Sequence, residues 1–241
     1  MNILAIGNSF SQDATRYLHG IAKADGEDLN VVNLYIGGCS LEKHYNNMLS
    51  DEKTYELQYN GIRTEFLVSL SKALLNRSWD IVTIQQASHL SFDYESYEPY
   101  ATELAAYVRR HSPGARLYIH QTWAYEDGSN RLSAVAKYDS FASMQMDVIS
   151  AYNKAAKSIN ADGIIPSGEL FLTLLNSGIT RIHRDTFHAS LGIGRYALGL
   201  LWYQTLMGKS VLENTFSDFD EDISDGDVKR IKEAVSLLFK S

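Results

Sequence analysis

The chain has 241 residues, an apolar fraction of 45% and a formal net charge of -7 at neutral pH. Phosphate backbones need clustered Lys and Arg, and no basic run here is longer than two residues, as in Arg109-Arg110, so the composition argues against nucleic acid as a partner. No run approaches the roughly 18 apolar residues of a membrane span, which argues against a membrane partner. The apolar fraction suffices for a substantial core, and we expect a single domain over residues 1–241.

The amino terminus and the cysteine content bear on the compartment. The first residues lack the basic segment, apolar stretch and cleavage site of a signal peptide. We therefore expect a soluble protein, either cytoplasmic or exported with its signal removed. The single cysteine, Cys39, excludes an intramolecular disulfide and cannot build a thiolate metal site by itself. Its place between Gly38 and Ser40 is typical of a small packing residue.

Short apolar runs alternate with longer helix-like stretches, which is the pattern of a parallel sheet covered by helices on both faces. The runs that predict strands are residues 3–6, 31–35, 81–84, 117–120 and 163–165. The stretches that predict helices are residues 14–24, 64–76, 97–111, 138–159, 191–207 and 227–239. Residues 41–61 and 122–137 are the least regular, and we expect both to form loops just after strand ends.

Polar or glycine-containing segments follow directly after the predicted strands. They are Ser9, Gly37-Gly38, Gln85-Gln86 and His120-Gln121. In an open parallel sheet, ligands bind beyond the carboxyl ends of the strands. We therefore expect these segments to share one crevice.

Ser9 stands where the first predicted strand turns sharply into a helix, after the pair Gly7-Asn8. At a helix N-terminus, unpaired N–H groups and the helix dipole favour a developing negative charge, which suits the nucleophile of an acyl transfer. The alternative is that Ser9 only caps the helix, a role that Ser11 or Asp13 can take instead.

A second block far downstream contains Asp185 and His188, three residues apart. At this spacing a carboxylate can orient an imidazole, and the imidazole can deprotonate a serine that the fold brings near. Together with Ser9, this block predicts a hydrolase.

These blocks resemble those of the SGNH, or GDSL-like, hydrolases. Residues 7–11 (Gly-Asn-Ser-Phe-Ser), Gly37-Gly38 and residues 185–188 (Asp-Thr-Phe-His) match the family's blocks in order and spacing, and the likeness spans most of the chain. The nearest in appearance is a bacterial branch that opens with a similar GNSFS-type block. The resemblance implies a flavodoxin-like three-layer α/β/α sandwich with a central parallel sheet of about five strands. It also implies hydrolysis of esters of lipids, of thioesters or of acetylated carbohydrates.

Carried over residue by residue, the resemblance implies a triad in which Ser9 is the nucleophile, His188 the general base and Asp185 the residue that orients the imidazole. Such a triad needs no metal and no cofactor. The resemblance also implies an oxyanion hole made by the backbone N–H groups of Ser9 and of the glycine turn, with Gly38 preferred over Gly37. Glycine fits there because the backbone must approach the substrate closely.

One block departs from the family pattern. Many members have an Asn after the third strand whose amide completes the oxyanion hole, whereas this chain has Gln85-Gln86. In carbohydrate acetylesterase-like branches a Gln occupies this place, and its amide can donate the same hydrogen bond. Strand alternation points neighbouring side chains to opposite sides, so only one of the two can face Ser9. We expect Gln85 to do so, with Gln86 as the alternative, and whichever glutamine turns away to cap the strand edge.

The other histidines allow a metal site as an alternative. His183 and His120 can be imagined as ligands together with the Asp and His of the triad. A hydrolytic metal site needs three convergent ligands, and no further His or paired carboxylate stands at a supporting spacing, so we expect no metal. His44 and His89 fall on loops near the proposed crevice.

The same loops offer aromatic rings that can stack on sugars, namely Tyr45, Tyr55, Tyr59, Trp123 and Tyr125. The loops are polar and charged, unlike a lipase lid, so we expect small acyl groups, acetyl above all, on a carbohydrate or another small ester. The alternative is a carbohydrate-binding protein on the same fold with weak or no turnover. A nucleotide- or flavin-binding protein lacks support, because residues 7–11 match neither G-x-G-x-x-G nor a P-loop.

Overall fold

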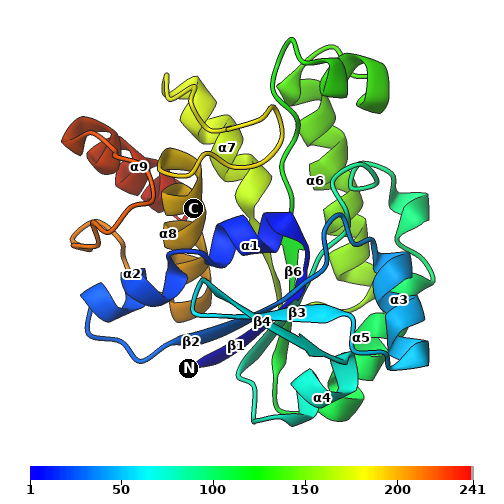
Figure 1. Ribbon diagram of the computed structural model, residues 1–241. Helices are drawn as coiled ribbons and strands as arrows, with labels where there is room; N and C mark the ends of the chain where they lie inside the picture. The colour runs from blue at the N-terminus through cyan, green and yellow to red at the C-terminus, as the bar shows by residue number, and fades with distance from the viewer. Residues whose placement is uncertain (240–241) are drawn as a thin grey trace.

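A seven-stranded sheet forms the centre of the computed structural model, which describes residues 1–239 (Figure 1). The strands are β1 (Asn2–Gly7), β2 (Asn30–Tyr35), β3 (Tyr55–Tyr59), β4 (Ile62–Val68), β5 (Ile81–Ile84), β6 (Arg116–Gln121) and β7 (Gly163–Pro166). Their order across the sheet is β4-β3-β2-β1-β5-β6-β7. The strands β2, β1, β5, β6 and β7 run parallel, while β3 and β4 form an antiparallel hairpin at one edge.

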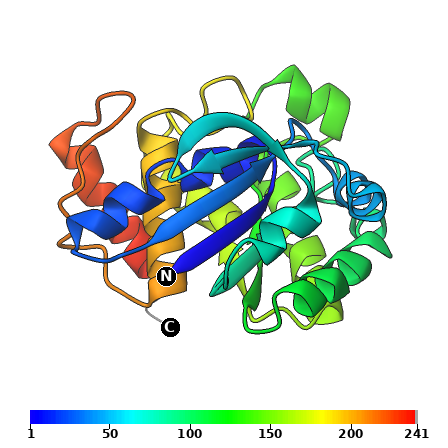
Figure 2. The same cartoon turned by 60° about the horizontal axis from the view of Figure 1, so that its bottom comes forward.

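Helices cover both faces of this sheet. They are α1 (Ser9–Thr15), α2 (Leu18–Ala24), α3 (Leu41–Ser50), α4 (Leu70–Leu75), α5 (Tyr100–His111), α6 (Phe141–Ser158), α7 (Ser167–Asn176), α8 (Ile193–Met207) and α9 (Asp225–Leu237), with a 3-10 turn η1 (Tyr94–Ser96) and a π-helical turn η2 (Arg131–Ala136). Figure 2 shows the strands between a layer with α2, α8 and α9 and a layer with α3, α4 and α5. No helix within residues 1–239 is both long and apolar enough to cross a membrane.

The central strands are buried on both faces, as their apolar sequences require. The side chains of residues 3–6 in β1 and of Ile81, Val82 and Ile84 in β5 have an exposed fraction of at most 1%. Continuous apolar runs of this kind are typical of parallel strands between two helical layers. The three-layer α/β/α sandwich with a parallel centre is therefore confirmed.

The parallel strands match the predicted ones, but the region between β2 and β5 differs from the prediction. Residues 41–61, expected to be a loop, contain α3 and β3, and the helix expected over residues 64–76 is split into β4 and the short α4. The hairpin turns at Asn60 and Gly61, both with positive φ (50° and 80°). Such a pair is the signature of a tight hairpin turn, so the Asn-Gly dipeptide is the signal that reveals β3 and β4.

Two further elements were missed. The helix α7 follows β7 directly and packs against α8, and the second expected loop, residues 122–137, contains η2. The first expected helix is divided into α1 and α2 and begins at Ser9 rather than at residue 14. This earlier start places Ser9 in the first turn of α1.

Candidate active site

The carboxyl ends of β1, β2 and β5 lie level with one another. Ile6 of β1 is paired with Leu34 on one side and with Ile84 on the other. The chain moves from β1 to β2 in one direction and returns to β5 on the opposite side of β1, so strand order reverses at β1. Clefts for ligands form at such switch points. The loops that follow the three strands therefore meet beside Ser9.

Ser9 owes its position to the two residues before it. Asn8 is the N-cap of α1, and its Oδ1 accepts a 3.0 Å hydrogen bond from the N–H of Phe10. The cap is thus neither Ser9 itself nor Ser11 or Asp13. A Cβ atom at Gly7 would lie 2.3 Å from Ser11 Oγ and 2.9 Å from the Gln85 amide oxygen, so only glycine allows the strand to turn here.

Asp185 and His188 belong to a narrow loop that enters the site from the other end of the chain. The loop is closed by a bridge between His183 and Ala189 and by the Arg184 N–H, which donates a 3.0 Å hydrogen bond to the His188 carbonyl. Thr186, at its tip, has φ of 74°, a strained conformation for a β-branched residue. The loop therefore fixes the backbone of Thr186 in a conformation that β-branched residues rarely adopt.

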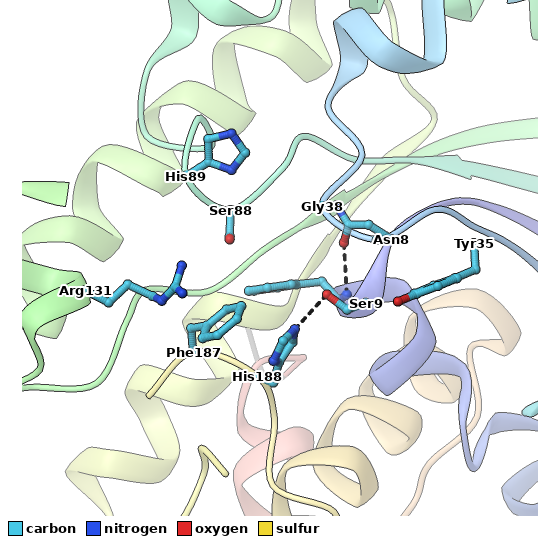
Figure 3. Close-up of a pocket in the computed structure, with 11 residues that line it drawn as sticks. Asn8, Ser9, Tyr35, Gly38, Ser88, His89, Arg131, Phe187 and His188 are labelled. Carbon is cyan, nitrogen blue, oxygen red and sulfur yellow. Dashed lines mark hydrogen bonds between the residues drawn. The ribbon is translucent and has the colours of Figure 1, made fainter. Parts of the chain in front are cut away.

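The two segments meet in a continuous chain of hydrogen bonds, of which Figure 3 shows the contact between Ser9 and His188. His188 Nε2 lies 2.8 Å from Ser9 Oγ, and His188 Nδ1 lies 2.7 Å from Asp185 Oδ2. Asp185 Oδ1 also accepts a 2.9 Å hydrogen bond from the His188 backbone N–H. Burial raises the pKa of Asp185, but these hydrogen bonds outweigh it and lower the pKa below its ordinary value. The carboxylate stays ionised and fixes the imidazole with Nε2 toward the serine.

A buried ion pair connects the two segments behind the site. Asp13 of α1 is fully buried, and the Arg184 guanidinium lies 2.9 Å from both of its oxygens. Arg195 of α8 contributes a further 2.9 Å contact to the same carboxylate. The helix that carries Ser9 is thus tied to the loop that carries His188.

Gly38 lies in an exposed turn after β2. The turn is closed by a 3.2 Å hydrogen bond from the Cys39 N–H to the Ile36 carbonyl, and Gly38 has φ of 61°. The side chain of Asn8 donates a 3.0 Å hydrogen bond to the Cys39 carbonyl, which holds this turn against Ser9. Cys39 itself is buried, as expected for a packing residue, and burial raises the pKa of its thiol to about 12.

Gln85 is near the site but its amide does not line the pocket beside Ser9. Its Nε2 donates a 2.7 Å hydrogen bond to Asn8 Oδ1, and its Oε1 accepts one of 2.9 Å from His120 Nδ1. Burial lowers the pKa of His120 to about 3, so the ring is neutral and its Nε2 can accept from Ser167, 3.0 Å away. The structure thus differs from the expected direct approach of Gln85 to Ser9, because Asn8 occupies the space between them.

Gln86 points to the opposite side of the sheet and does not line the pocket either. Its Oε1 accepts a hydrogen bond of 3.0 Å from the Leu41 N–H, and its Nε2 donates one of 2.9 Å to the Ser96 carbonyl. It therefore ties α3 and η1 to the end of β5, which is the structural role expected for whichever glutamine turns away from Ser9.

A pocket of about 270 Å³ opens beside Ser9 and His188. Its walls are lined by Asn8, Ser9, Phe10, Tyr35, Gly37, Gly38, Ser88, His89, Arg131, Phe187 and His188. His89 is thus part of it, whereas His44 is fully buried elsewhere, 3.0 Å from the Tyr55 hydroxyl. The five aromatic residues proposed as sugar platforms do not line it; Tyr35 and Phe187 do. Phe187 adjoins His188 in the sequence, so the motif itself pointed to it, but nothing in the sequence singled out Arg131.

The histidines considered as metal ligands have other partners. Both ring nitrogens of His120 are engaged as described, and His183 Nε2 lies 3.1 Å from the Ala124 carbonyl oxygen. Burial lowers the pKa of His183 to about 4. Within residues 1–239, no three His, Cys, Asp or Glu side chains are grouped so that they could hold a metal ion.

Comparison with known proteins gives a family and a fold. The family described as "Domain of unknown function (DUF4886)" matches residues 2–235. A DUF4886 family protein from Bacteroides uniformis ATCC 8492 is 34% identical, with a TM-score of 0.93 over 99% of this chain and 94% of its own. No curated protein matches the sequence.

More distant structures share the fold alone. A candidate SGNH hydrolase from Slackia heliotrinireducens is 22% identical, with a TM-score of 0.62 over 86% of this chain and 98% of its own. Phospholipase A1 from Streptomyces albidoflavus NA297 is 11% identical, with a TM-score of 0.53 over 86% of this chain and 98% of its own. The α/β sandwich of this chain therefore matches that of the SGNH hydrolases.

Proposed function

The chain belongs to the DUF4886 family, and from the arrangement at its sheet edge we propose that it is a serine esterase that hydrolyses small acyl esters. The observation that carries the proposal is the series Ser9, His188 and Asp185, with contacts of 2.8 and 2.7 Å between successive side chains. A nucleophile, a base within hydrogen-bond reach and a carboxylate that orients the base are the elements of acyl-transfer catalysis. The fold shared with SGNH hydrolases agrees with this proposal.

In the proposed mechanism, Ser9 Oγ attacks the ester carbonyl carbon while His188 Nε2 takes its proton. The tetrahedral intermediate then collapses, and the imidazolium returns the proton to the leaving alcohol, so that an acyl-serine remains. A water molecule repeats the sequence, with His188 again as the base, and releases the carboxylic acid. Asp185 stabilises the imidazolium formed in both halves.

The oxyanion would be held by backbone N–H groups of Ser9 and Gly38. The positive φ of Gly38 turns this peptide in a way that residues with side chains rarely adopt, and the exposed turn leaves room for a substrate oxygen. In this proposal Gln85 does not contact the oxyanion but positions the groups that do. Its amide binds Asn8, and Asn8 binds both the start of α1 and the glycine turn.

The size of the pocket supports a small acyl group. Its volume of about 270 Å³ lies just below the range of about 300–1,000 Å³ usual for drug-sized ligands. Tyr35, a half-buried ring in its wall, is the remaining support for a carbohydrate alcohol, since such rings pack against sugar faces. We therefore retain acetyl esters of small alcohols, sugars included, as the proposed substrates.

The test is hydrolysis of 4-nitrophenyl esters from acetyl to octanoyl by wild-type protein and by Ser9→Ala. Loss of a triad nucleophile costs on the order of 10⁶-fold in kcat, so turnover should vanish in the variant while its circular dichroism is unchanged. The control is Ser78→Ala, at an exposed serine remote from the pocket, which should keep full activity. Equal turnover by wild type and Ser9→Ala would overturn the proposal.

A second measurement distinguishes a binding protein without catalytic activity from an esterase that accepts few substrates. A fluorophosphonate forms a bond from phosphorus to Ser9 Oγ with loss of fluoride only where the serine is activated. Wild-type protein should gain the adduct on Ser9, and His188→Asn should not. A folded wild type that neither labels nor hydrolyses any ester would favour a carbohydrate-binding protein without turnover.

A further inference from the structure

The pocket beside Ser9 contains one permanent charge. Among its lining residues there is no Asp, Glu or Lys, and the sole guanidinium is that of Arg131, at the start of η2. The chain as a whole carries a net charge of -7, whereas the one permanent charge among the lining residues of this pocket is positive. Figure 3 shows the Arg131 side chain reaching toward the space next to Phe187 and Ser88.

Arg131 is held close to the triad by aromatic stacking. Its Cζ atom lies 3.8 Å from the centre of the Phe187 ring and 5.5 Å from that of Tyr125. The Phe187 ring in turn lies 3.8 Å from the imidazole of His188. Two short stacking steps thus lead from the guanidinium to the triad. The Tyr125 hydroxyl is also a hydrogen-bond partner of Arg131, and a guanidinium has five N–H donors, so others are left for an acceptor in the pocket.

No carboxylate neutralises this cation. Within residues 1–239, the ion pairs of arginine involve Arg16, Arg63, Arg181, Arg184, Arg195 and Arg230, and none involves Arg131. Burial and the positive charge of Arg131 lower the pKa of nearby His89, which is therefore neutral at pH 7. The half-buried guanidinium thus faces a concave site that offers it no countercharge.

We propose that Arg131 binds an anionic group of the substrate, so that the preferred esters carry a carboxylate or a phosphate near the scissile bond. This inference rests on the proposed esterase function and narrows its substrate class. The planar fork of arginine matches the two oxygens of such anions, and charge-assisted bonds of this kind are stronger than neutral ones. A neutral ester would leave the cation unpaired, whereas an anionic ester would pair with it.

The anion can belong to the acyl group or to the alcohol, and two matched substrate pairs distinguish these sources. The acyl pair is 4-nitrophenyl hemiglutarate and 4-nitrophenyl pentanoate, with spontaneous hydrolysis subtracted. The alcohol pair is 3-acetoxybenzoate and its neutral amide, 3-acetoxybenzamide. Wild-type protein should show a higher kcat/KM for the charged member of one pair, and that pair identifies the side of the ester that carries the anion.

The variant Arg131→Gln tests the assignment of the residue. It should lower kcat/KM for the preferred charged ester by about 10- to 100-fold, as expected for a charged hydrogen bond, and change the neutral ester less than about threefold. Arg131→Lys should restore part of the preference. The matched control is Arg77→Gln, an exposed arginine that also stacks on an aromatic ring, 5.4 Å from Trp79, away from the pocket.

Equal rates for charged and neutral members of both pairs, or an equal loss on both in Arg131→Gln, would overturn the inference and leave the esterase standing. A readout without turnover uses the Ser9→Ala variant and calorimetry. The Ser9→Ala variant should bind 3-acetoxybenzoate at least tenfold more tightly than 3-acetoxybenzamide. The double variant with Ser9→Ala and Arg131→Gln should bind both compounds with equal affinity. Equal affinities would reject the anion site even if the proposed hydrolysis itself fails.

Discussion

Asp13 and Arg184, which are 171 positions apart in the sequence, form a buried ion pair directly behind the Ser9–His188 contact. Loss of the Asp13 carboxylate should cost about 1.5–3 kcal/mol of stability, the range for hydrogen bonds to a charged group, because Arg184 is partly exposed and Arg195 keeps Asp220 as a partner. The pair is also the link between two segments that must meet within hydrogen-bond distance. Its contribution therefore extends from stability to the geometry of the triad.

The first prediction concerns Asp13→Ala. It should lower the free energy of unfolding by about 1.5–3 kcal/mol and, in the fraction that stays folded, reduce kcat about 100-fold, since small misplacements of reacting groups have costs of this size. Urea unfolding and ester hydrolysis measure both. The control is Glu221→Gln, in the exposed pair with Arg181, where a change below about 1 kcal/mol is expected. Full activity in folded Asp13→Ala would show that the pair does not position the triad.

The second prediction concerns pH. Hydrogen bonds from His188 outweigh burial and keep the pKa of Asp185 below its usual value near 3.9, so this carboxylate remains ionised as the pH falls from 8 to 5. Asp185 therefore adds no second protonation in that window, and log kcat/KM against pH should have a slope no greater than about one. A slope of two would contradict an Asp185 that stays ionised beside a single histidine base.

The third prediction concerns Gly38. A Cβ atom there would meet nothing within 4 Å, so Gly38→Ala acts only through its positive φ, with a stability cost of about 1 kcal/mol. If its N–H holds the oxyanion, kcat should fall by about 100-fold as the peptide reorients. Gly208→Ala is the matched control, because Gly208 also has a positive φ of 68° and open space around it but lies at the end of α8. Equal kinetics for the two variants would remove Gly38 from the proposed oxyanion hole.

The fourth prediction separates two roles for Gln85. If Gln85 only holds Asn8 and His120, then Gln85→Ala should lower kcat about tenfold and the free energy of unfolding by about 1–3 kcal/mol, through buried groups left without partners. A direct oxyanion donor would cost about 100- to 1,000-fold in kcat. Gln86→Ala leaves comparable backbone groups without partners on the far side of β5, so it should match the stability loss with kcat unchanged. A fall in kcat of about 100-fold or more in Gln85→Ala, without such a fall in Gln86→Ala, would instead support Gln85 as a direct oxyanion donor.

The sequence predicted best those features that depend on residues close together in the chain. The strand-to-helix turn at Ser9 and the close spacing of Asp185 and His188 are local features, and apolar runs mark the parallel strands. The contact between the two blocks, however, depends on packing, in which Arg184 beside Asp185 pairs with Asp13 of α1. The Asn-Gly turn of the β3–β4 hairpin and the N-cap serines Ser40 of α3 and Ser69 of α4 are local signals that the sequence prediction missed.

The other features depend on contacts between distant segments, which no local pattern encodes. The direction of the Gln85 amide is set by Asn8, just after β1, and by His120 in β6. Arg131 lies in a segment without a regular pattern, and its place in the pocket follows from stacking on Phe187, 56 positions later. Propensity and periodicity describe neither relationship, because both arise only after the chain has packed.

Ser9 and His188 stand 179 positions apart, near opposite ends of the chain. A ribosome that has completed β1 and even all seven strands has yet to add the loop that carries the proposed base, so a chain that ends before this loop lacks the group proposed to activate Ser9. A fluorophosphonate adduct on Ser9 would therefore count only finished, folded molecules, which makes the reagent a direct probe of native protein in a cell extract.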